Sequence, residues 1–111
     1  MDKFEEMLRL QKEFQDTYKG RFTFTKFRVS IAMLLEAVEV MEAQDFGDGK
    51  NFKWWSKKPL PSREERIEEM VDVFHFFMLL MLEDEVTVTE FFEAYKKKLA
   101  ENYARQESNK Y

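Results

Sequence analysis

Four carboxylates in two separate segments are the residues of this chain best suited to chemistry. Glu36 and Glu39 stand three residues apart, and Glu69 and Asp72 repeat that spacing further along. On a helix, residues three apart share one face, with roughly 5–6 Å between their β-carbons. If two such helices lie side by side, the four acids can converge. Oxygen ligation without His or Cys suits Mg²⁺, or Mn²⁺, better than zinc.

A basic segment that contains both tryptophans lies between the two acidic segments. Residues 46–61 hold two of the three glycines and both prolines, which predicts a loop. The loop includes the run Phe52-Lys53-Trp54-Trp55-Ser56-Lys57-Lys58. Cationic and aromatic side chains together favour an anionic ligand that contains a ring. With a divalent cation and an activated water, these residues would form a site for hydrolysing a nucleoside polyphosphate.

Each of these features also has a purely structural interpretation. A run of glutamates at three-residue steps is usually the solvated face of a helix. A tryptophan pair more often packs in the core than binds a ligand, and the lysines would then keep the loop soluble. Gln11 lies on the apolar stripe of the first segment, where a buried amide would need a partner.

Hydrophobic spacing predicts four helices and no strands. Apolar residues recur at helical intervals over residues 3–19, 25–45 and 88–106. Capping-box patterns at Ser62 and Thr87 predict where the third and fourth helices begin. We expect the second helix to turn these residues inward: Phe27, Ile31, Leu34, Leu35, Val38 and Met41. The expected fold is all-α, a small four-helix bundle forming a single domain over residues 1–111.

The third predicted helix is apolar almost all round over residues 70–82. Such a helix is typically central, and one small bundle cannot cover it completely. We therefore expect a homodimer or a dimer of dimers. Asp72-x-x-His75 has the spacing of a di-iron ligand pair, but the single histidine cannot complete the two pairs that such a site needs. We expect His75 to be a core histidine bonded to a polar neighbour.

Composition narrows the classes of function. The 111 residues are 44% hydrophobic and 16% aromatic, as expected of a folded chain. A net charge of −4 argues against general binding of nucleic acid or an acidic membrane. No cysteine is present, which excludes disulfides and thiolate metal sites. The N-terminus lacks a signal-peptide h-region, and the longest apolar run is too short to span a bilayer. We expect a cytoplasmic protein.

Several segments resemble a known family. Glu36-Ala-Val-Glu39 and Glu69-Met-Val-Asp72 resemble the ExxE…ExxD pattern of the MazG-like, all-α nucleotide pyrophosphohydrolases. Within that superfamily, four further segments resemble the dimeric all-α dUTPases: Leu10-Gln11, Phe52-Lys53-Trp54-Trp55, Asp72-Val73-Phe74-His75-Phe76, and Asn102-Tyr103-Ala104-Arg105-Gln106 followed by Tyr111. Their order and rough spacing match that family over nearly the whole chain.

The resemblance implies Mg²⁺-dependent hydrolysis of dUTP, and of dUDP, to dUMP. The four acids would hold the metal, and one of them would orient or deprotonate the attacking water. The implied nucleoside-binding residues are Gln11 at the uracil, Phe76 near the base, and Trp54 and Trp55 along the pocket. The implied phosphate-binding residues are Lys53, Lys57, Asn102, Arg105 and Tyr111.

Three alternatives stay open at this level. The segment between Glu39 and Phe52 is longer than is usual in the family, so Glu39 and Glu42 can replace Glu36 and Glu39 as the first acidic pair. The chain is short, so dCTP or another nucleotide can be the substrate in place of dUTP. Outside the enzyme class, the acids can be surface charge on a non-catalytic interaction module. Nucleic-acid binding through the basic loop is disfavoured by the net charge.

Overall fold

The computed structural model describes residues 2–21 and 25–108, and these residues form four α-helices without strands. The helices are α1 (Lys3–Tyr18), α2 (Lys26–Glu42), α3 (Arg63–Glu83) and α4 (Val88–Glu107). The predicted all-α class and the number of predicted helices are therefore confirmed. Tyr111, which the resemblance places among the phosphate-binding residues, lies outside the described residues.

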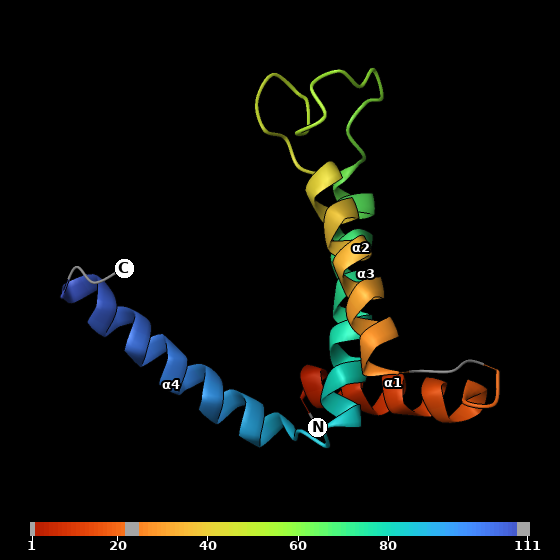
Figure 1. Ribbon diagram of the computed structural model, residues 1–111, viewed down its shortest axis with the longest axis vertical. Coiled ribbons are helices and arrows are strands. Elements are labelled where there is room, and N and C mark those ends of the chain that lie inside the picture. Colours follow the sequence, from red (N-terminus) through yellow and green to blue (C-terminus); the bar gives the residue numbers. More distant parts are fainter. Residues whose placement is uncertain (1, 22–24, 109–111) are drawn as a thin grey trace.

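An antiparallel pair of helices forms the axis of the molecule. α2 and α3 run side by side in opposite directions, and α1 lies across the end of the pair where α3 finishes (Figure 1). The long connection between α2 and α3 projects from the other end of the pair (Figure 1). The pairing follows from the chain order, because consecutive helices usually pack as antiparallel neighbours.

Local capping sets where the helices begin and end. Ser62 and Thr87 each accept a hydrogen bond from the backbone N–H three residues later, and both predicted capping boxes are present. α2 ends at Glu42, three residues earlier than the periodicity predicts. The side-chain amide of Asn51 donates to the carbonyl of Glu42 at 2.6 Å, which satisfies a terminal acceptor and ties the loop back to the helix.

The hydrophobic core lies where α1, α3 and the first turn of α4 meet. Leu8, Met78 and Met81 are its buried centre. The partly buried residues packed around this centre are Phe4, Phe74, Phe77, Leu82, Val86, Val88 and Phe91. Four of these are phenylalanines whose rings contact one another at centroid distances between 5.6 and 6.1 Å. This core fixes the root of α4 against α1 and α3.

Two expectations about burial are wrong in the single chain. Phe27, Ile31, Leu34, Leu35 and Met41, which the periodicity turns inward, are between 42% and 75% exposed. The reason is that, among the described residues, α3 is the helix that packs extensively along α2, and one helix leaves most of the apolar surface of α2 uncovered. His75 is also exposed and is not a core histidine, because it lines two neighbouring pockets.

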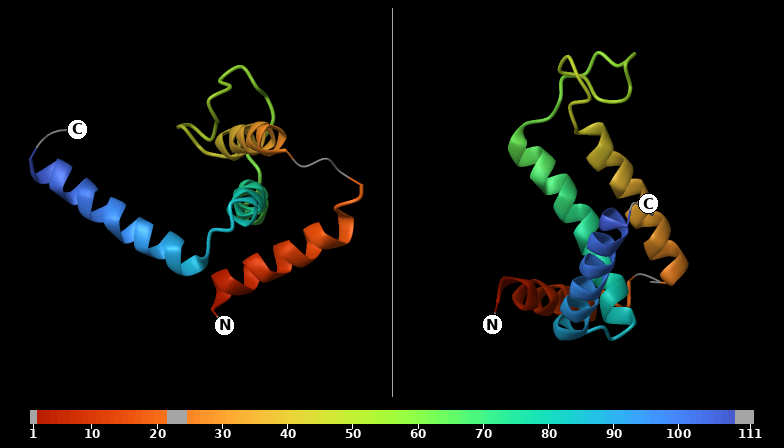
Figure 2. Two further views of the ribbon diagram at one scale, coloured as in Figure 1. Left: turned by 60° about the horizontal axis from the view of Figure 1, so that its bottom comes forward. Right: turned by 90° about the vertical axis from the view of Figure 1, so that its left-hand side faces the viewer.

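The last helix projects away from the other three. Beyond its root, α4 diverges from the α2–α3 pair, and it stands apart from those helices in Figure 1 and in the left view of Figure 2. Phe92, Tyr95, Leu99 and Tyr103 on this helix are between 41% and 64% exposed. None of the helices in the described part of the chain is long and apolar enough to cross a membrane.

Candidate active site

The pairing of α2 with α3 brings three acidic side chains together. One carboxylate oxygen from each of Glu36, Glu69 and Asp72 lies within 4.8 Å of the other two. Glu36 comes from the second half of α2 and the other two from the first half of α3. Antiparallel packing brings these two stretches to the same level. The geometry thus includes three of the four acids that the sequence suggested would converge.

The carboxylates of this cluster are in an environment that disfavours their charged form. Oε2 of Glu36 and Oε2 of Glu69 are buried and have no hydrogen-bond partner. Burial raises the pKa of Glu36 above its usual range, and the neighbouring charge of Glu39 adds to the increase. Burial also raises the pKa of Glu69, followed by its contact with the Glu39 carboxyl. Unpaired buried oxygens are costly, and a divalent cation with a preference for oxygen ligands would satisfy them.

Glu39 lies at the edge of the cluster. Its side chain is exposed, and it is close enough to Glu36 and Glu69 to raise their pKa values. Glu42 is placed differently, because its carboxylate pairs with the ammonium group of Lys53 at 2.8 Å. Glu36, and not Glu42, is therefore the α2 residue that meets the two acids of α3.

A pocket with two glutamines opens on one side of the carboxylates. This amide pocket has a volume of about 500 Å³ and is lined by Gln11, Phe14, Gln15, Glu36, Asp72, His75, Phe76 and Leu79. Gln11 is buried, and Nε2 of Gln15 is buried without a hydrogen-bond partner. Apolar walls with a few unpaired polar groups are typical of a pocket that receives a planar heterocycle.

A second pocket, lined by basic residues, opens on the other side. This basic pocket has a volume of about 540 Å³ and is lined by Glu39, Glu42, Ala43, Asn51, Lys53, Trp55, Ser56, Lys58, Pro59, Pro61 and Glu69. Its lysines come from the loop between α2 and α3. The acidic residues border both pockets, because Glu36 and Asp72 line the amide pocket and Glu69 lines the basic one.

Not every residue implied by the resemblance reaches these pockets. Trp54 is 75% exposed, and neither Trp54 nor Lys57 lines the amide pocket or the basic pocket. Asn102 and Arg105 lie near the far end of α4, the helix that stands apart from the pair carrying the acids (Figure 1). Gln11, Phe76, Lys53 and Trp55 do line the two pockets.

Gln15 and Lys58 line the pockets but were not singled out as site residues from the sequence. Gln15 lies one helical turn after Gln11, so its i+4 spacing from that residue was the available signal. Lys58 was treated only as part of the basic loop, and the loop's irregular backbone decides that Lys58 lines the basic pocket while Lys57 does not. Irregular backbone has no period from which side-chain direction can be read.

The paired helices gather carboxylates between an amide-bearing pocket and a basic pocket, which is the arrangement expected of an all-α nucleotide hydrolase. The family follows from comparison with family models, where the model described as dUTPase matches residues 3–111. The chain belongs to this all-α dUTPase family, whose reaction is the hydrolysis of dUTP and dUDP to dUMP. The family, the enzyme class and the reaction expected from the sequence are thus confirmed. Searches of curated proteins and of solved structures found no match to this chain.

Proposed function

We propose that this chain hydrolyses dUTP with Mg²⁺ held by Glu36, Glu39, Glu69 and Asp72. The observation that carries the proposal is the carboxylate cluster of Glu36, Glu69 and Asp72. One carboxylate oxygen from each residue lies within 4.8 Å of the other two, and two oxygens of the cluster are buried without hydrogen-bond partners. Like charges so close together are unfavourable in the absence of a counter-charge. The donor set consists of hard oxygens only, which fits Mg²⁺, with Mn²⁺ as the nearest substitute.

The two pockets divide the substrate between them. The uracil and its sugar lie in the amide pocket, where Gln11 hydrogen-bonds the base and Phe76 packs near it. The phosphates lie across the carboxylates toward the basic pocket, where Lys53 and Trp55 line the wall. Of the other implied residues, Trp54 covers the nucleoside, and Lys57, Asn102, Arg105 and Tyr111 complete the phosphate contacts.

Hydrolysis breaks the bridging P–O bond between the α- and β-phosphates. A water molecule attacks phosphorus, its proton passes to a carboxylate, and pyrophosphate leaves with dUMP as the other product. We assign the proton acceptor to Glu39, because this carboxylate is exposed and lines the basic pocket beside the clustered acids. Bound Mg²⁺ supplies charge neutralisation at the phosphate oxygens. The lysines of the loop bind the phosphates and hold the reacting bond beside the acids.

A second candidate substrate is dCTP, because the base-binding groups are side-chain amides. Each amide offers a donor and an acceptor and can turn to present either. Uracil presents two carbonyl acceptors around one N–H donor, whereas cytosine presents an amino donor beside two acceptors. Gln11 and Gln15 can satisfy either pattern by rotating their amides. Uracil selectivity is therefore a property to be measured.

The proposal is tested with a panel of deoxynucleoside triphosphates assayed for pyrophosphate release. With Mg²⁺ present, we expect dUTP to be cleaved at least about tenfold faster than dCTP, and chelation of the metal to abolish turnover. Equal rates with dCTP and dUTP would remove the uracil assignment but leave the reaction class in place. Turnover that survives complete removal of divalent cations would contradict the metal site.

We further propose that the working protein is a homodimer or a dimer of dimers, as expected from the apolar helix surfaces. The support is the exposure of Phe27, Leu34 and Leu35 on α2, with 61% to 75% of each side chain uncovered in the single chain. Sedimentation at micromolar concentration measures this directly, and a monomer would contradict it. A cytoplasmic location stays a prediction from the sequence.

A further inference from the structure

The single chain exposes far more surface than a compact protein of its size. Its accessible surface is 9106 Å², and its radius of gyration is 17.5 Å. A compact chain of this mass and length exposes about 6,500 Å² and has a radius of gyration of about 13 Å. The excess of about 2,600 Å² is larger than the roughly 800 Å² that each partner buries in a standard interface. Obligate dimers bury more, roughly 1,000–2,500 Å² per partner, so a large interface with a second subunit would cover most of this excess.

The direction of α4 is built into the chain. The N–H of Val86 donates to the carbonyl of Met81 at 2.8 Å, and the N–H of Glu85 donates to that of Leu82 at 3.2 Å. With Glu85 at a φ of 55°, these bonds form a Schellman turn at the end of α3. Val86 and Phe91 then pack into the core on either side of the Thr87 cap. The turn, the cap and the core together aim α4 away from its own α2–α3 pair.

The projecting helix carries an apolar stripe with polar residues at its far end. Phe92, Tyr95, Leu99 and Tyr103 recur at intervals of three or four residues and are between 41% and 64% exposed. Asn102 lies within the stripe, and Arg105 lies three residues further, at its edge. Helices in proteins gain most of their stability from packing of an apolar face, so the exposed stripe of this 20-residue helix needs a surface to cover it.

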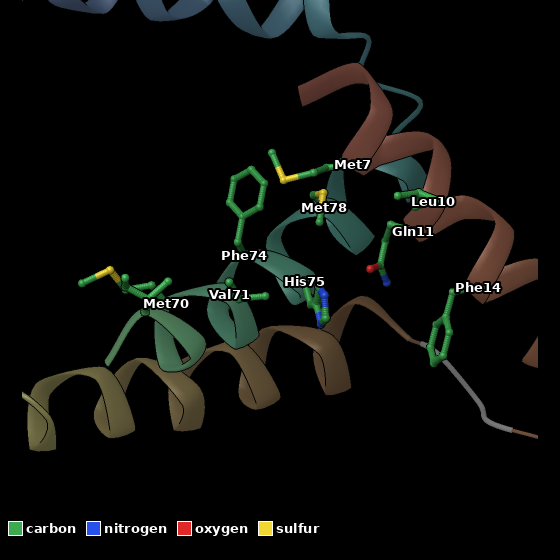
Figure 3. A pocket seen from close by; sticks show the side chains of 10 residues that line it. Met7, Leu10, Gln11, Phe14, Met70, Val71, Phe74, His75 and Met78 are labelled. Carbon is green, nitrogen blue, oxygen red and sulfur yellow. The ribbon is translucent and has the colours of Figure 1, made fainter. Parts of the chain in front are cut away.

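A matching uncovered surface lies between α1 and α3. This apolar pocket has a volume of about 610 Å³, and its most exposed walls are Met7, Leu10, Phe14, Ile67, Met70 and Val71. Figure 3 shows Gln11 and Phe14 of α1 beside His75 of α3 at one end of the pocket. The same three residues also line the amide pocket, so a helix seated here would end beside the carboxylates.

We propose that α4 is an arm that crosses to a second copy of this chain and completes that copy's active site. The apolar stripe of the arm seats in the apolar pocket of the second copy, and Arg105 and Asn102 meet the phosphates bound at that copy's acids. If a two-fold axis relates the two chains, the stripe of each chain covers the pocket of the other. Such two-fold symmetry is the usual form of a dimer interface. This inference rests on the proposed function, because it assigns the phosphate-binding end of that site to the partner chain.

Mixed dimers test the exchange of arms. One chain carries Asp72→Asn and the other Arg105→Gln, each with a different affinity tag, and the mixed dimer is isolated by purification on both tags. If arms act across the dimer, one of the two sites has intact acids and an intact arm. The mixed dimer should then turn over dUTP at about half the wild-type rate per dimer. We expect the Asp72→Asn homodimer to be inactive and the Arg105→Gln homodimer to be at least about tenfold slower than wild type.

The outcomes separate this inference from the proposed function. A mixed dimer no faster than half the rate of the Arg105→Gln homodimer would mean that each arm serves its own chain, and the inference fails although dUTP hydrolysis stands. An Arg105→Gln homodimer as fast as wild type would also overturn it. Wild-type protein that does not cleave dUTP would remove the proposed function and the completion of its site together.

A pair of arm variants tests the docking without any assay of activity. Leu99→Glu places a charge in the stripe, whereas Ala104→Glu places the same charge on the opposite side of the same helix. Both positions are exposed in the single chain, which by itself would tolerate both changes. We expect Leu99→Glu to weaken dimerisation at least about a hundredfold in sedimentation, and Ala104→Glu to leave it unchanged. Equal effects of the two substitutions would show that the stripe is not an interface.

Discussion

Glu69 links the parts of the candidate site, because it belongs to the carboxylate cluster and also lines the basic pocket. Its Oε2 atom is buried without a partner, so the fold tolerates this residue at a cost in stability. Groups retained at such a cost are typical of functional sites. At this position, activity and stability should therefore respond to substitution in opposite directions.

The Glu69→Gln substitution keeps the shape of the side chain and removes its charge. We expect dUTP turnover to fall at least about 100-fold, because the site loses a ligand and a negative charge. Without metal, the melting temperature should stay equal or rise, since repulsion among the acids is relieved. Pyrophosphate release and thermal melts measure both effects. Glu68→Gln, at an exposed neighbouring position, is the matched control and should change neither.

The pH dependence of stability measures the cost of the charged Glu69 carboxylate in the folded chain. Because the pKa of Glu69 is raised in the folded chain, protonation favours folding. That contribution is complete below the ordinary pKa of the unfolded carboxyl and is lost as pH rises through the folded value. In metal-free melts, Glu69→Gln should have the higher melting temperature. The difference from wild type should therefore increase from pH 5 to pH 8. A difference in melting temperature that decreases over this range would show that the charge of Glu69 does not destabilise the fold.

Gln15 is a site residue that the sequence did not single out. Its buried Nε2 atom has no partner in the described chain, and it lines the pocket assigned to the base. We expect Gln15→Met to raise KM for dUTP about five- to tenfold with little change in kcat, because about 1 kcal/mol of hydrogen bonding to substrate is lost. Thermal stability should not fall, since no existing hydrogen bond of this amide is removed.

The matched control is Gln44→Met, because Gln44 is also partly buried but donates to the carbonyl of Val40 at 3.1 Å. This change should lower the melting temperature slightly and leave KM unaffected. If Gln15→Met lowered stability and left KM unchanged, the amide would have a structural role instead.

At the scale of single elements, the turn between α3 and α4 has an unusual residue at its centre. Glu85 adopts a φ of 55°, a left-handed conformation in which a residue with a β-carbon is strained. The turn nevertheless keeps its shape, because its two backbone hydrogen bonds and the packing of Val86 hold it. The strain is local, so it can be relieved without altering the helices on either side.

Glu85→Gly should therefore stabilise the protein by about 1 kcal/mol, as measured by urea denaturation. Asp84→Gly is the contrasting control, because Asp84 has an ordinary φ of −88° and pairs with Lys26 at 2.5 Å. That change should destabilise, since it adds backbone freedom and removes the ion pair. If Glu85→Gly also destabilised the protein, the Glu85 side chain would have a role that the turn geometry does not reveal.

At the scale of the whole molecule, the single chain buries few of its apolar side chains. Only six apolar residues are buried in the described part of the chain, namely Leu8, Val29, Ala43, Met78, Leu79 and Met81. Apolar faces of α1, α2, α3 and α4 stay open to solvent. Stability should therefore be shared between folding and association, as in dimers that lack a stable folded monomer.

The expected consequence is a melting temperature that rises with protein concentration. A hundredfold increase in chain concentration shifts the association free energy by about 2.7 kcal/mol per dimer. Scanning calorimetry at two concentrations measures the shift, with Leu99→Glu as the control that should respond less. Identical melting temperatures for wild type at both concentrations would mean that the chain folds and melts alone.

Local signals in the sequence predicted most of the secondary structure. The capping boxes at Ser62 and Thr87 fix helix starts through bonds between residues three apart, so they can be read without tertiary information. The acidic spacing likewise predicted which residues share a face. The end of α2 was less predictable, because the hydrogen bond from Asn51 to Glu42 spans nine residues and depends on how the loop folds back.

The sequence by itself determined the helical class, the family resemblance and the set of candidate acids, with Glu42 as an alternative, because these depend on residue types and on spacings of three or four positions. The tertiary structure decided that Glu36 and not Glu42 meets the acids of α3, that Gln15 and Lys58 line the pockets, and that α4 points away from its own chain. These features depend on helix packing, loop path and turn geometry. Contacts between distant segments leave no periodic trace in the order of residues.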